Sequence, residues 1–398
     1  MSLAHGRPYL AIPGPSVMPD AVLRAMHRAS PNIYAGELDE ITASLIPDLA
    51  DIARTKGKTA IYIGNGHAAW EAALVNTLSP GDKVLVPATG RFGLFWADMA
   101  VGLGIVPQII DYGRSQPVDP QQIEDMLRAD KAHEIKAVLA THVDTSTSVR
   151  NDISAIRAAM NAAGHPALLM ADCIASLVCD RYEMDAWGVD VTLAASQKGL
   201  MVPPGLAFVW FNEKAAEVRA GKERVSRYWD WSPRVAPQRL SEYFCGTAPT
   251  HHVYGLRAAL DMIKQEGLEA IWQRHELLAR AVWAACEAWA QGGPLRLNVA
   301  DPAHRGHEVT ALSLGAPHGT ALRTWLESKA DVTLGIGLGM ETPEDPKSDG
   351  FFRIGHMGHV NAHMVMGVLG TVQAGMSALD IPYGSGALDA AAAVMAEA

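Results

Sequence analysis

Short apolar runs alternate with stretches of helical periodicity between Lys58 and Val209. The pattern predicts strands over residues 59–63, 83–87, 106–110, 137–142, 167–171, 191–194 and 206–210. It predicts helices over residues 68–78, 92–103, 120–129 and 153–163. Strands that alternate with helices are typical of βαβ units, so the pattern predicts an α/β fold with a mostly parallel, doubly wound sheet.

The pattern changes after Tyr254, where strands become fewer. Two long helices are predicted over residues 254–266 and 268–291, followed by helices over 319–329 and 362–378 and short strands over 309–314 and 352–354. This mixture predicts a smaller α+β domain. We therefore expect a large domain over residues 16–260 and a small C-terminal domain over residues 261–398, which also includes residues 1–15.

Composition narrows the class of protein. The chain has 398 residues, 49% of them hydrophobic, and so can bury a large core. Its net charge of −10 argues against nucleic-acid binding, which needs a basic surface. No apolar run reaches the roughly 18 residues of a membrane span, and the N-terminus has no signal-peptide core. We expect a cytoplasmic protein that binds neither nucleic acid nor membrane, with four reduced cysteines.

Two charged residues follow neighbouring predicted strands. Asp172 ends the run 168–171, and Lys198 follows the strand over 191–194. Strand ends of a parallel sheet meet at the edge where such folds bind ligands. A lysine amine can form a Schiff base with the aldehyde of pyridoxal 5'-phosphate, and a carboxylate can pair with its ring nitrogen. The alternative is structural: Asp172 caps a turn and Lys198 is solvated.

The turn after residues 59–63 carries glycines. Gly64 and Gly66 precede the helix over 68–78, where backbone N–H groups and the helix dipole can hold a phosphate. Gly64, Gly66 and Ala69 also fit the permissive dinucleotide fingerprint of nicotinamide oxidoreductases. That class needs an acid at the end of the next strand, but Asp82 lies before that strand. A single-phosphate site is therefore favoured.

These motifs together resemble a known family. The segment SQKGLMVPPG at residues 196–205, with Asp172 upstream, resembles the class-V aminotransferases of fold type I, in particular the alanine–glyoxylate and serine–glyoxylate enzymes. The segments GHAAWEAAL at 66–74 and NTLSPGD at 76–82 strengthen the likeness. It extends from PGP at residues 13–15 to RIG at residues 353–355.

The resemblance implies a role for each matched residue. Lys198 would bind the cofactor covalently and move the α-proton, and Asp172 would pair with the pyridine nitrogen. Arg353 would hold the substrate α-carboxylate. Thr247 would contact the phosphate of the neighbouring subunit, which implies a homodimer with shared active sites. The other residues implied to contact the cofactor are Asn65, Gly66, His67, Phe92, Thr145 and Gln197.

The chain departs from the family pattern at several positions. Asn65 stands where serine or threonine is usual, Phe244 replaces a tyrosine, and Val143 replaces a small or amide residue. His356, His359 and His363 have spacing compatible with a metal site, but no clear carboxylate ligand accompanies them, so no metal is expected.

The resulting hypothesis is transamination between alanine or serine and a small 2-oxo acid such as glyoxylate or pyruvate. A pyridoxamine–pyruvate aminotransferase is the alternative, because it shares the segment RIGHMG at residues 353–358. A nicotinamide-dependent oxidoreductase and a non-catalytic binding protein are less favoured. A cysteine desulfurase is disfavoured, because no cysteine lies between residues 287 and 398.

Overall fold

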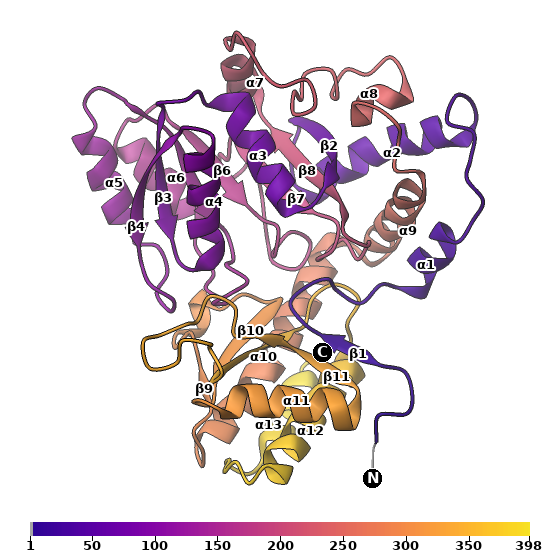
Figure 1. The fold of residues 1–398 in the computed structure, drawn as a ribbon, viewed down its shortest axis with the longest axis vertical. Helices are drawn as coiled ribbons and strands as arrows, with labels where there is room; N and C mark the ends of the chain where they lie inside the picture. Colours follow the sequence, from indigo (N-terminus) through magenta and orange to yellow (C-terminus); the bar gives the residue numbers. More distant parts are fainter. Residues whose placement is uncertain (1–2) are drawn as a thin grey trace.

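The computed structural model describes residues 3–398, whose larger sheet has seven strands in the order β2-β8-β7-β6-β5-β3-β4 (Figure 1). Strand β8 is antiparallel to both neighbours, and the other pairs are parallel, so the mostly parallel sheet is confirmed. The strands are β2 (Lys58–Gly64), β3 (Lys83–Ala88), β4 (Val106–Asp111), β5 (Ile135–Thr141), β6 (Leu168–Asp172), β7 (Val191–Ala195) and β8 (Gly205–Phe211).

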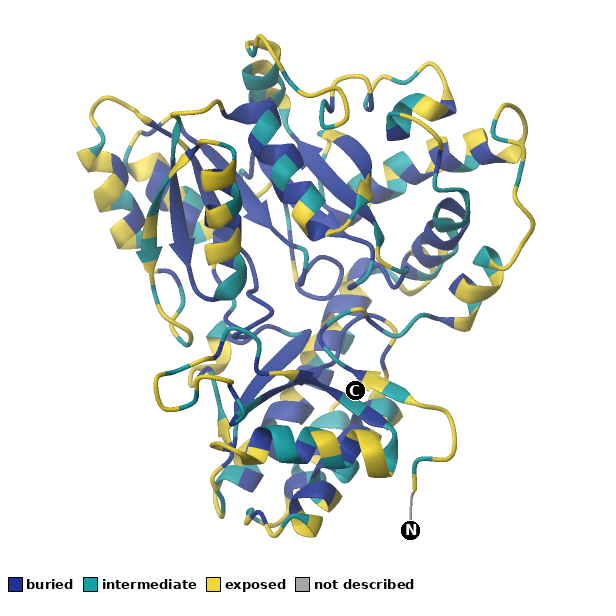
Figure 2. Cartoon of the chain, viewed as in Figure 1, coloured by how far each residue is buried: buried dark blue, intermediate teal, exposed yellow. Residues whose placement is uncertain are grey.

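Helices cover both faces of this sheet, and its central strands are buried on both sides (Figure 2). Along β5, Val138 and Ala140 join one hydrophobic cluster, whereas Ala137 and Leu139 join the other. Strands buried on two faces read as continuous apolar runs. The helices of this part are α1 (Asp20–Met26), α2 (Glu37–Ile52), α3 (Gly66–Thr77), α4 (Arg91–Gly102), α5 (Pro120–Ala129), α6 (Ile153–Ala162), α7 (Glu213–Ala220), α8 (Leu240–Phe244) and α9 (Thr250–Glu266).

A second sheet has the strand order β1-β11-β12-β10-β9 and includes the N-terminal strand β1. Strand β1 is parallel to β11, and the remaining pairs are antiparallel. Its strands are β1 (Tyr9–Ala11), β9 (Arg296–Leu297), β10 (Val309–Ser313), β11 (Val332–Ile336) and β12 (Phe351–Gly355). The accompanying helices are α10 (Leu268–Ala290), the 3-10 turn η1 (Pro302–His304), α11 (His318–Ala330), α12 (Ala362–Ala378) and α13 (Ala387–Met395).

Helix α10 belongs to both parts of the molecule. Its first turns place Ile271 and Trp272 in a core cluster of the large sheet, whereas Leu278 and Trp289 lie in the core of the second sheet. The predicted division at residue 260 falls within α9. The boundary itself stays a prediction, because one continuous helix passes from one core to the other.

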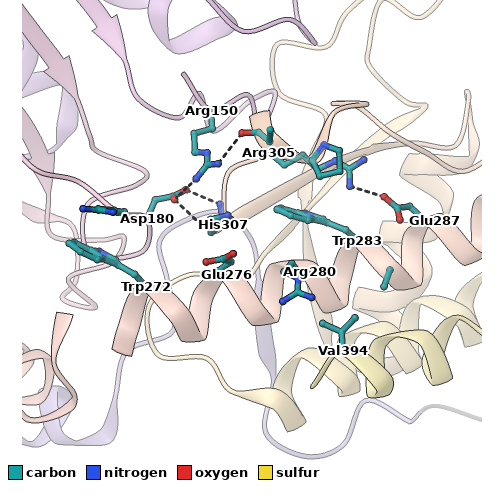
Figure 3. A pocket seen from close by; sticks show the side chains of 14 residues that line it. Arg150, Asp180, Trp272, Glu276, Arg280, Trp283, Glu287, Arg305, His307 and Val394 are labelled. Atoms are coloured by element: carbon teal, nitrogen blue, oxygen red, sulfur yellow. Dashed lines mark hydrogen bonds and ion pairs between the residues drawn. The ribbon is translucent and has the colours of Figure 1, made fainter. Parts of the chain in front are cut away.

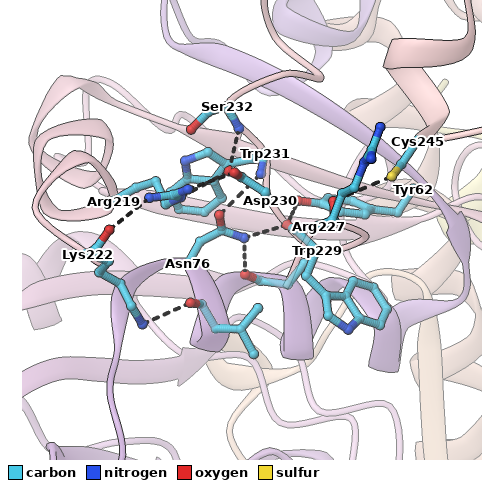
Figure 4. A network of polar contacts seen from close by, with 12 residues as sticks. Tyr62, Asn76, Arg219, Lys222, Arg227, Trp229, Asp230, Trp231, Ser232 and Cys245 are labelled. Carbon is cyan, nitrogen blue, oxygen red and sulfur yellow. Dashed lines mark hydrogen bonds and ion pairs between the residues drawn. The ribbon is translucent and has the colours of Figure 1, made fainter. Parts of the chain in front are cut away.

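A polar network fixes the segment that follows α7 against the end of α3 (Figure 4). Lys222 Nζ donates to the carbonyl of Val75 at 2.9 Å, and Asn76 Nδ2 donates to the carbonyl of Trp229 at 2.7 Å. A lysine near a helix C-terminus satisfies carbonyls that have no partner within the helix. The network therefore anchors the chain that leads through α8 to Thr247. Within residues 3–398, no helix is both long and apolar enough to cross a membrane.

Candidate active site

A cavity of about 250 Å³ lies beyond the carboxyl ends of β6 and β7. This is the edge of the sheet where doubly wound folds bind ligands. Eight of the ten candidate residues line it: Asn65, Gly66, His67, Phe92, Thr145, Asp172, Gln197 and Lys198. The sequence thus identified residues from five separate segments that the fold brings to one cavity.

Lys198 is buried, and its chain is held by the N-terminal segment. Its Nζ donates to the carbonyl of Pro13, and Ser16 Oγ donates to the Lys198 carbonyl at 2.8 Å. Gly14, whose φ is +96°, lies so close that a Cβ there would come 2.6 Å from Lys198 Nζ. Burial, and then the positive charge of Arg353, lowers the pKa of Lys198 to about 8. The amine is therefore easier to deprotonate than an exposed lysine.

Asp172 is buried at the end of β6 and accepts two hydrogen bonds. Its Oδ1 accepts from the backbone N–H of Ile174 at 2.9 Å, and its Oδ2 accepts from Trp70 Nε1 at 3.0 Å. Burial raises the pKa of Asp172 to about 7, although both hydrogen bonds oppose this rise. A cationic ring nitrogen in the cavity would favour the ionised carboxylate further.

The first turn of α3 forms one end of the cavity. Asn65 is the N-cap, and its Oδ1 accepts from the backbone N–H of His67 at 3.1 Å. Gly66 allows close packing there, because a Cβ would meet Ile174 Cδ1 at 2.5 Å. The atypical Asn65 thus works as an ordinary helix cap. Free N–H groups at a helix N-terminus suit a phosphate.

Gln197 provides a test of whether these residues fit a cofactor. Its Oε1 is buried and has no hydrogen-bond partner within residues 3–398. Buried polar atoms without partners are rare in proteins and call for an explanation. Gln197 lines the cavity together with Asn65 and Gly66, so a ligand in this space that carries an N–H or O–H donor can supply the missing partner of this acceptor oxygen. The N–H groups at the start of α3 are the donors that fit the phosphate of a cofactor, whereas the Gln197 oxygen fits a donor elsewhere on the same ligand.

The loop after β5 carries Thr145 and connects the cavity to the second sheet. Arg353, on β12, donates from Nη1 to the Thr145 carbonyl and from Nε to the Ile336 carbonyl, both at 2.8 Å. Asp144, whose Oδ2 accepts from the backbone N–H of Phe92 at 2.9 Å, fixes the same loop to the start of α4. Thr145 and Phe92 are thereby held on the cavity wall.

Arg353 is 5% exposed and forms no ion pair within residues 3–398. Burial lowers the pKa of Arg353 to about 10, so the guanidinium remains charged at neutral pH. A buried cation without a carboxylate partner is costly, and a bound carboxylate would compensate it. Arg353 does not line the cavity itself but contacts its wall through Thr145.

The candidate residue Thr247 and the atypical residue Phe244 both lie away from this cavity. Thr247 is exposed and does not line it, whereas Phe244 is 1% exposed and belongs to the core of the large sheet. Phe244 replaces the family's tyrosine without reaching the surface. Its position explains why an apolar ring is accepted there, because the ring packs among the apolar side chains of that core.

A second cavity, of about 580 Å³, lies between the loops of the large sheet and α10 (Figure 3). Asp180 accepts from Arg150 Nη1 at 3.0 Å and from the backbone N–H and Nδ1 of His307 at 3.0 and 2.9 Å. Arg280 and Arg305 also form ion pairs with acidic side chains. The arginines of this cavity are thus already neutralised. The Asp180 cluster joins the loop after β5 to the chain before β10.

His356 and His363, two of the histidines whose spacing is compatible with a metal site, lie in different surroundings. His356 is buried, with Nε2 at 2.8 Å from Thr310 Oγ1 and Nδ1 at 3.0 Å from the His307 carbonyl. His363 lies on α12 and is exposed. No group of three or more potential ligands is placed to hold a metal within residues 3–398.

Comparison with known proteins identifies the family. The family described as Aminotransferase class-V matches residues 9–342. A serine–glyoxylate aminotransferase from Methylorubrum extorquens is 37% identical over 94% of this chain and 92% of its own length. An L-aspartate–glyoxylate aminotransferase from Paracoccus denitrificans is 33% identical over 96% of this chain and 94% of its own.

Solved structures show the same fold over nearly the whole chain. The ureidoglycine–glyoxylate aminotransferase of Bacillus subtilis has a TM-score of 0.85 and 27% identity, covering 99% of this chain and 100% of that chain. The pyridoxamine–pyruvate aminotransferase of Mesorhizobium loti has a TM-score of 0.85 and 26% identity, covering 99% of each. The fold is therefore that of the fold-type I aminotransferases, as the sequence predicted.

The chain belongs to the class-V aminotransferases, and it is an enzyme of that class. The oxidoreductase alternative also fails on topology. A dinucleotide-binding βαβ unit requires its two strands to be parallel and close together. Here β2 is an edge strand, and four strands separate it from β3. The glycines of the turn after β2 therefore belong to a different phosphate site.

Proposed function

We propose that this enzyme depends on pyridoxal 5'-phosphate and transfers an amino group between a small amino acid, alanine or serine, and glyoxylate or pyruvate. The observation that carries the proposal is that Lys198 and Asp172, from the ends of neighbouring strands, line one cavity. The buried guanidinium of Arg353 lies beside its wall. Bound pyridoxal phosphate supplies an aldehyde and an electron sink for the bonds of the α-carbon.

The chain's own residues position and move protons in this proposal. Lys198 would bind the aldehyde carbon of the cofactor covalently. Once the substrate amine has released it, the Lys198 amine would act as the base that takes the proton from the substrate α-carbon and returns it to that former aldehyde carbon. Asp172 keeps the pyridine nitrogen protonated. Arg353 binds the substrate carboxylate through the guanidinium N–H groups that the Thr145 and Ile336 carbonyls leave free, which fixes the α-carbon near Lys198 Nζ.

The proposed substrates rest on the relatives. Relatives from Methylorubrum extorquens and Arabidopsis thaliana, at 37% and 35% identity, are serine–glyoxylate aminotransferases. A cavity of about 250 Å³ must hold the cofactor and the substrate, which suits small substrates. Glyoxylate as the amino acceptor is common to these relatives and to the aspartate-specific one.

A pyridoxamine–pyruvate aminotransferase is the second candidate, supported by the structural likeness to the Mesorhizobium loti enzyme. The phosphate cradle, which is the first turn of α3 at residues 65–67, argues against free pyridoxamine as the substrate. The cavity residues at the first turn of α3 are Asn65, Gly66 and His67, and none of them is acidic. A helix N-terminus with neutral side chains favours a phosphate dianion over the neutral hydroxymethyl group of the free vitamin.

A half-reaction screen tests the proposed function. Purified protein is loaded with pyridoxal phosphate, mixed with single amino acids, and followed by visible absorbance. We expect a coloured protein whose band is lost fastest with serine or alanine and restored by glyoxylate. The matched reaction with free pyridoxamine and pyruvate tests the second candidate. A protein that remains colourless with pyridoxal phosphate would overturn the proposal.

The lysine assignment has its own control. Borohydride reduction of the loaded protein should attach the cofactor to the peptide that contains Lys198, and Lys198→Ala should abolish that attachment. Lys83, a partly exposed lysine outside the cavity that pairs with Glu134, serves as the control position, since Lys83→Ala should not change the labelled peptide. Unchanged labelling in Lys198→Ala would remove Lys198 from its proposed role.

The proposal also includes a homodimer in which two subunits share their active sites. Thr247 is exposed and lies outside its own cavity, which supports a contact with the phosphate site of a second subunit in a homodimer. The cytoplasmic location expected from the sequence stays a prediction.

A further inference from the structure

Trp70 occupies a position that its sequence context does not reveal. The residue is 1% exposed, belongs to the core cluster on one face of the large sheet, and also lines the candidate cavity. Its Nε1 donates to Asp172 Oδ2 at 3.0 Å. Its position in a core cluster suggests a packing role only. The structure shows that its single polar atom is directed at the buried carboxylate.

Helix α3 places Trp70 about one turn beyond the phosphate cradle. Gly66 and His67 begin the helix, and the imidazole of His67 packs on the Trp70 indole with ring centroids 4.6 Å apart. Phe92, on the cavity wall, meets the same indole edge-on at 6.3 Å. One rigid helix therefore contributes both to the phosphate cradle and to the support of Asp172, at opposite ends of the proposed cofactor.

We propose that Trp70 is a positioning residue, whose indole N–H holds the Asp172 carboxylate ionised and directed at the pyridine nitrogen of the cofactor. This inference rests on the proposed function. Asp172 has two oxygens, and the backbone N–H of Ile174 fixes only Oδ1. The indole N–H is then the contact that fixes Oδ2.

The chemistry of the indole explains why this contact matters. The indole N–H only donates, so it can stabilise a carboxylate but cannot accept a hydrogen bond from the O–H of a carboxylic acid. Burial raises the pKa of Asp172, and the Trp70 hydrogen bond counteracts this rise. Without that donor, more of Asp172 would be protonated near neutral pH. A protonated Asp172 has no negative charge with which to stabilise a cationic pyridinium ring.

The chain offers a matched control in Trp96. Its indole stacks on that of Trp70, with ring centroids 6.0 Å apart and an interplanar angle of 14°. Trp96 is fully buried, and its Nε1 has no hydrogen-bond partner within residues 3–398. Trp96→Phe therefore removes the same volume from the same cluster without removing a donor to Asp172.

The experiment compares Trp70→Phe and Trp96→Phe in the intact enzyme loaded with pyridoxal phosphate that carries ¹⁵N in its ring. The ¹⁵N chemical shift reports protonation of the pyridine nitrogen. We expect Trp70→Phe to shift this signal toward the unprotonated form and to slow the amino-acid half-reaction about ten-fold, as loss of a hydrogen bond to a charged group implies. Trp96→Phe should keep the wild-type signal.

A second comparison, made in the Asp172→Asn variant, tests whether Trp70 acts through Asp172 or only through its packing in the core. In Asp172→Asn, which lacks the charge that Trp70 supports, adding Trp70→Phe should change the half-reaction by less than about two-fold. Equal effects of Trp70→Phe and Trp96→Phe on the ¹⁵N signal, or a full effect in the Asp172→Asn background, would overturn the inference. A wild-type protein that does not bind pyridoxal phosphate would instead overturn the proposed function.

Discussion

Burial moves the pKa values of the two charged groups of the cavity toward each other. The pKa of Lys198 falls to about 8 and that of Asp172 rises to about 7, because both side chains lose water. Neither group is therefore fixed in one protonation state near neutral pH. A lysine that can release its proton is suited to attack an aldehyde, and a carboxyl group that is easily ionised by a cation is suited to a pyridinium ring.

The lowered pKa of Lys198 predicts how cofactor attachment depends on pH. The amine is neutral above its pKa, so the rate at which cofactor-free enzyme binds pyridoxal phosphate covalently should rise with pH and level off above about pH 8. Rapid-mixing absorbance measurements across neutral and alkaline pH test this expectation, with Lys198→Ala as the blank. A rate that still rises steeply near the ordinary lysine pKa of about 10.4 would contradict it.

At the residue scale, the sequence predicts which side chains carry the chemistry but not which ones support them. Asp172 and Lys198 follow strands, so sheet topology places them at one edge. Trp70 and Asp144 act through the direction of one side-chain atom, and helical or loop spacing does not specify that direction. A tryptophan one turn beyond a glycine-rich helix start was the available signal.

At the element scale, periodicity predicts the seven strands of the large sheet and helices α3 to α6 and α9, but it predicts no helix at α1, α2, α7 or α8. It does not predict strand direction, and β8 runs opposite to the others. Strands β1, β9 and β11 were also not predicted. Strand β1 has only three residues, and it pairs with β11, which lies more than 300 positions away in the chain. A short segment of this kind becomes a strand through its pairing partner rather than through its own pattern.

The loop between β5 and α6 holds the candidate site through the Asp180 cluster, which predicts a large effect of Asp180→Asn. The Asp180 side chain is 0% exposed and pairs with Arg150 and His307. Breaking a buried ion pair from one side costs about 3–5 kcal/mol. We expect the urea midpoint of the cofactor-free protein to fall accordingly. Asp180→Asn with wild-type stability would show that the cluster does not hold the loop.

The neighbouring pair between Arg181 and Glu183 is the control for that variant. Arg181 is 70% exposed on its side chain, and the 2.8 Å contact to Glu183 lies at the surface. Exposed pairs contribute at most about 1 kcal/mol. Glu183→Gln should therefore leave the urea midpoint nearly unchanged, which separates burial of the pair from loss of a charge in the same loop.

At the scale of the whole molecule, the position of Thr247 predicts that subunits share their sites. Thr247→Val should weaken pyridoxal phosphate binding by about ten-fold through loss of one hydrogen bond to a charged group. Mixed dimers of Thr247→Val and Lys198→Ala chains should contain one complete site, with wild-type affinity, if the hydroxyl acts across the interface. Binding titrations of purified mixed dimers provide the measurement.

The same mixed dimer shows what result would contradict a role of Thr247 across the subunit interface. If Thr247 acts within its own subunit, the site that retains Lys198 in the mixed dimer keeps the weakened affinity of Thr247→Val. If the protein in solution has the mass of one chain, the shared-site proposal fails directly. Mixed dimers of Arg280→Gln and Lys198→Ala chains are the control, because Arg280 forms a surface ion pair with Glu397.

Helix α10 limits how the enzyme can open and close. Its 23 residues span about 34 Å, with Trp272 anchored in one core and Trp289 in the other. A flexible joint would let the two bodies swing freely, but a continuous rod fixed at both ends permits only small sliding and tilting. Any movement of one sheet relative to the other must therefore tilt or bend this helix.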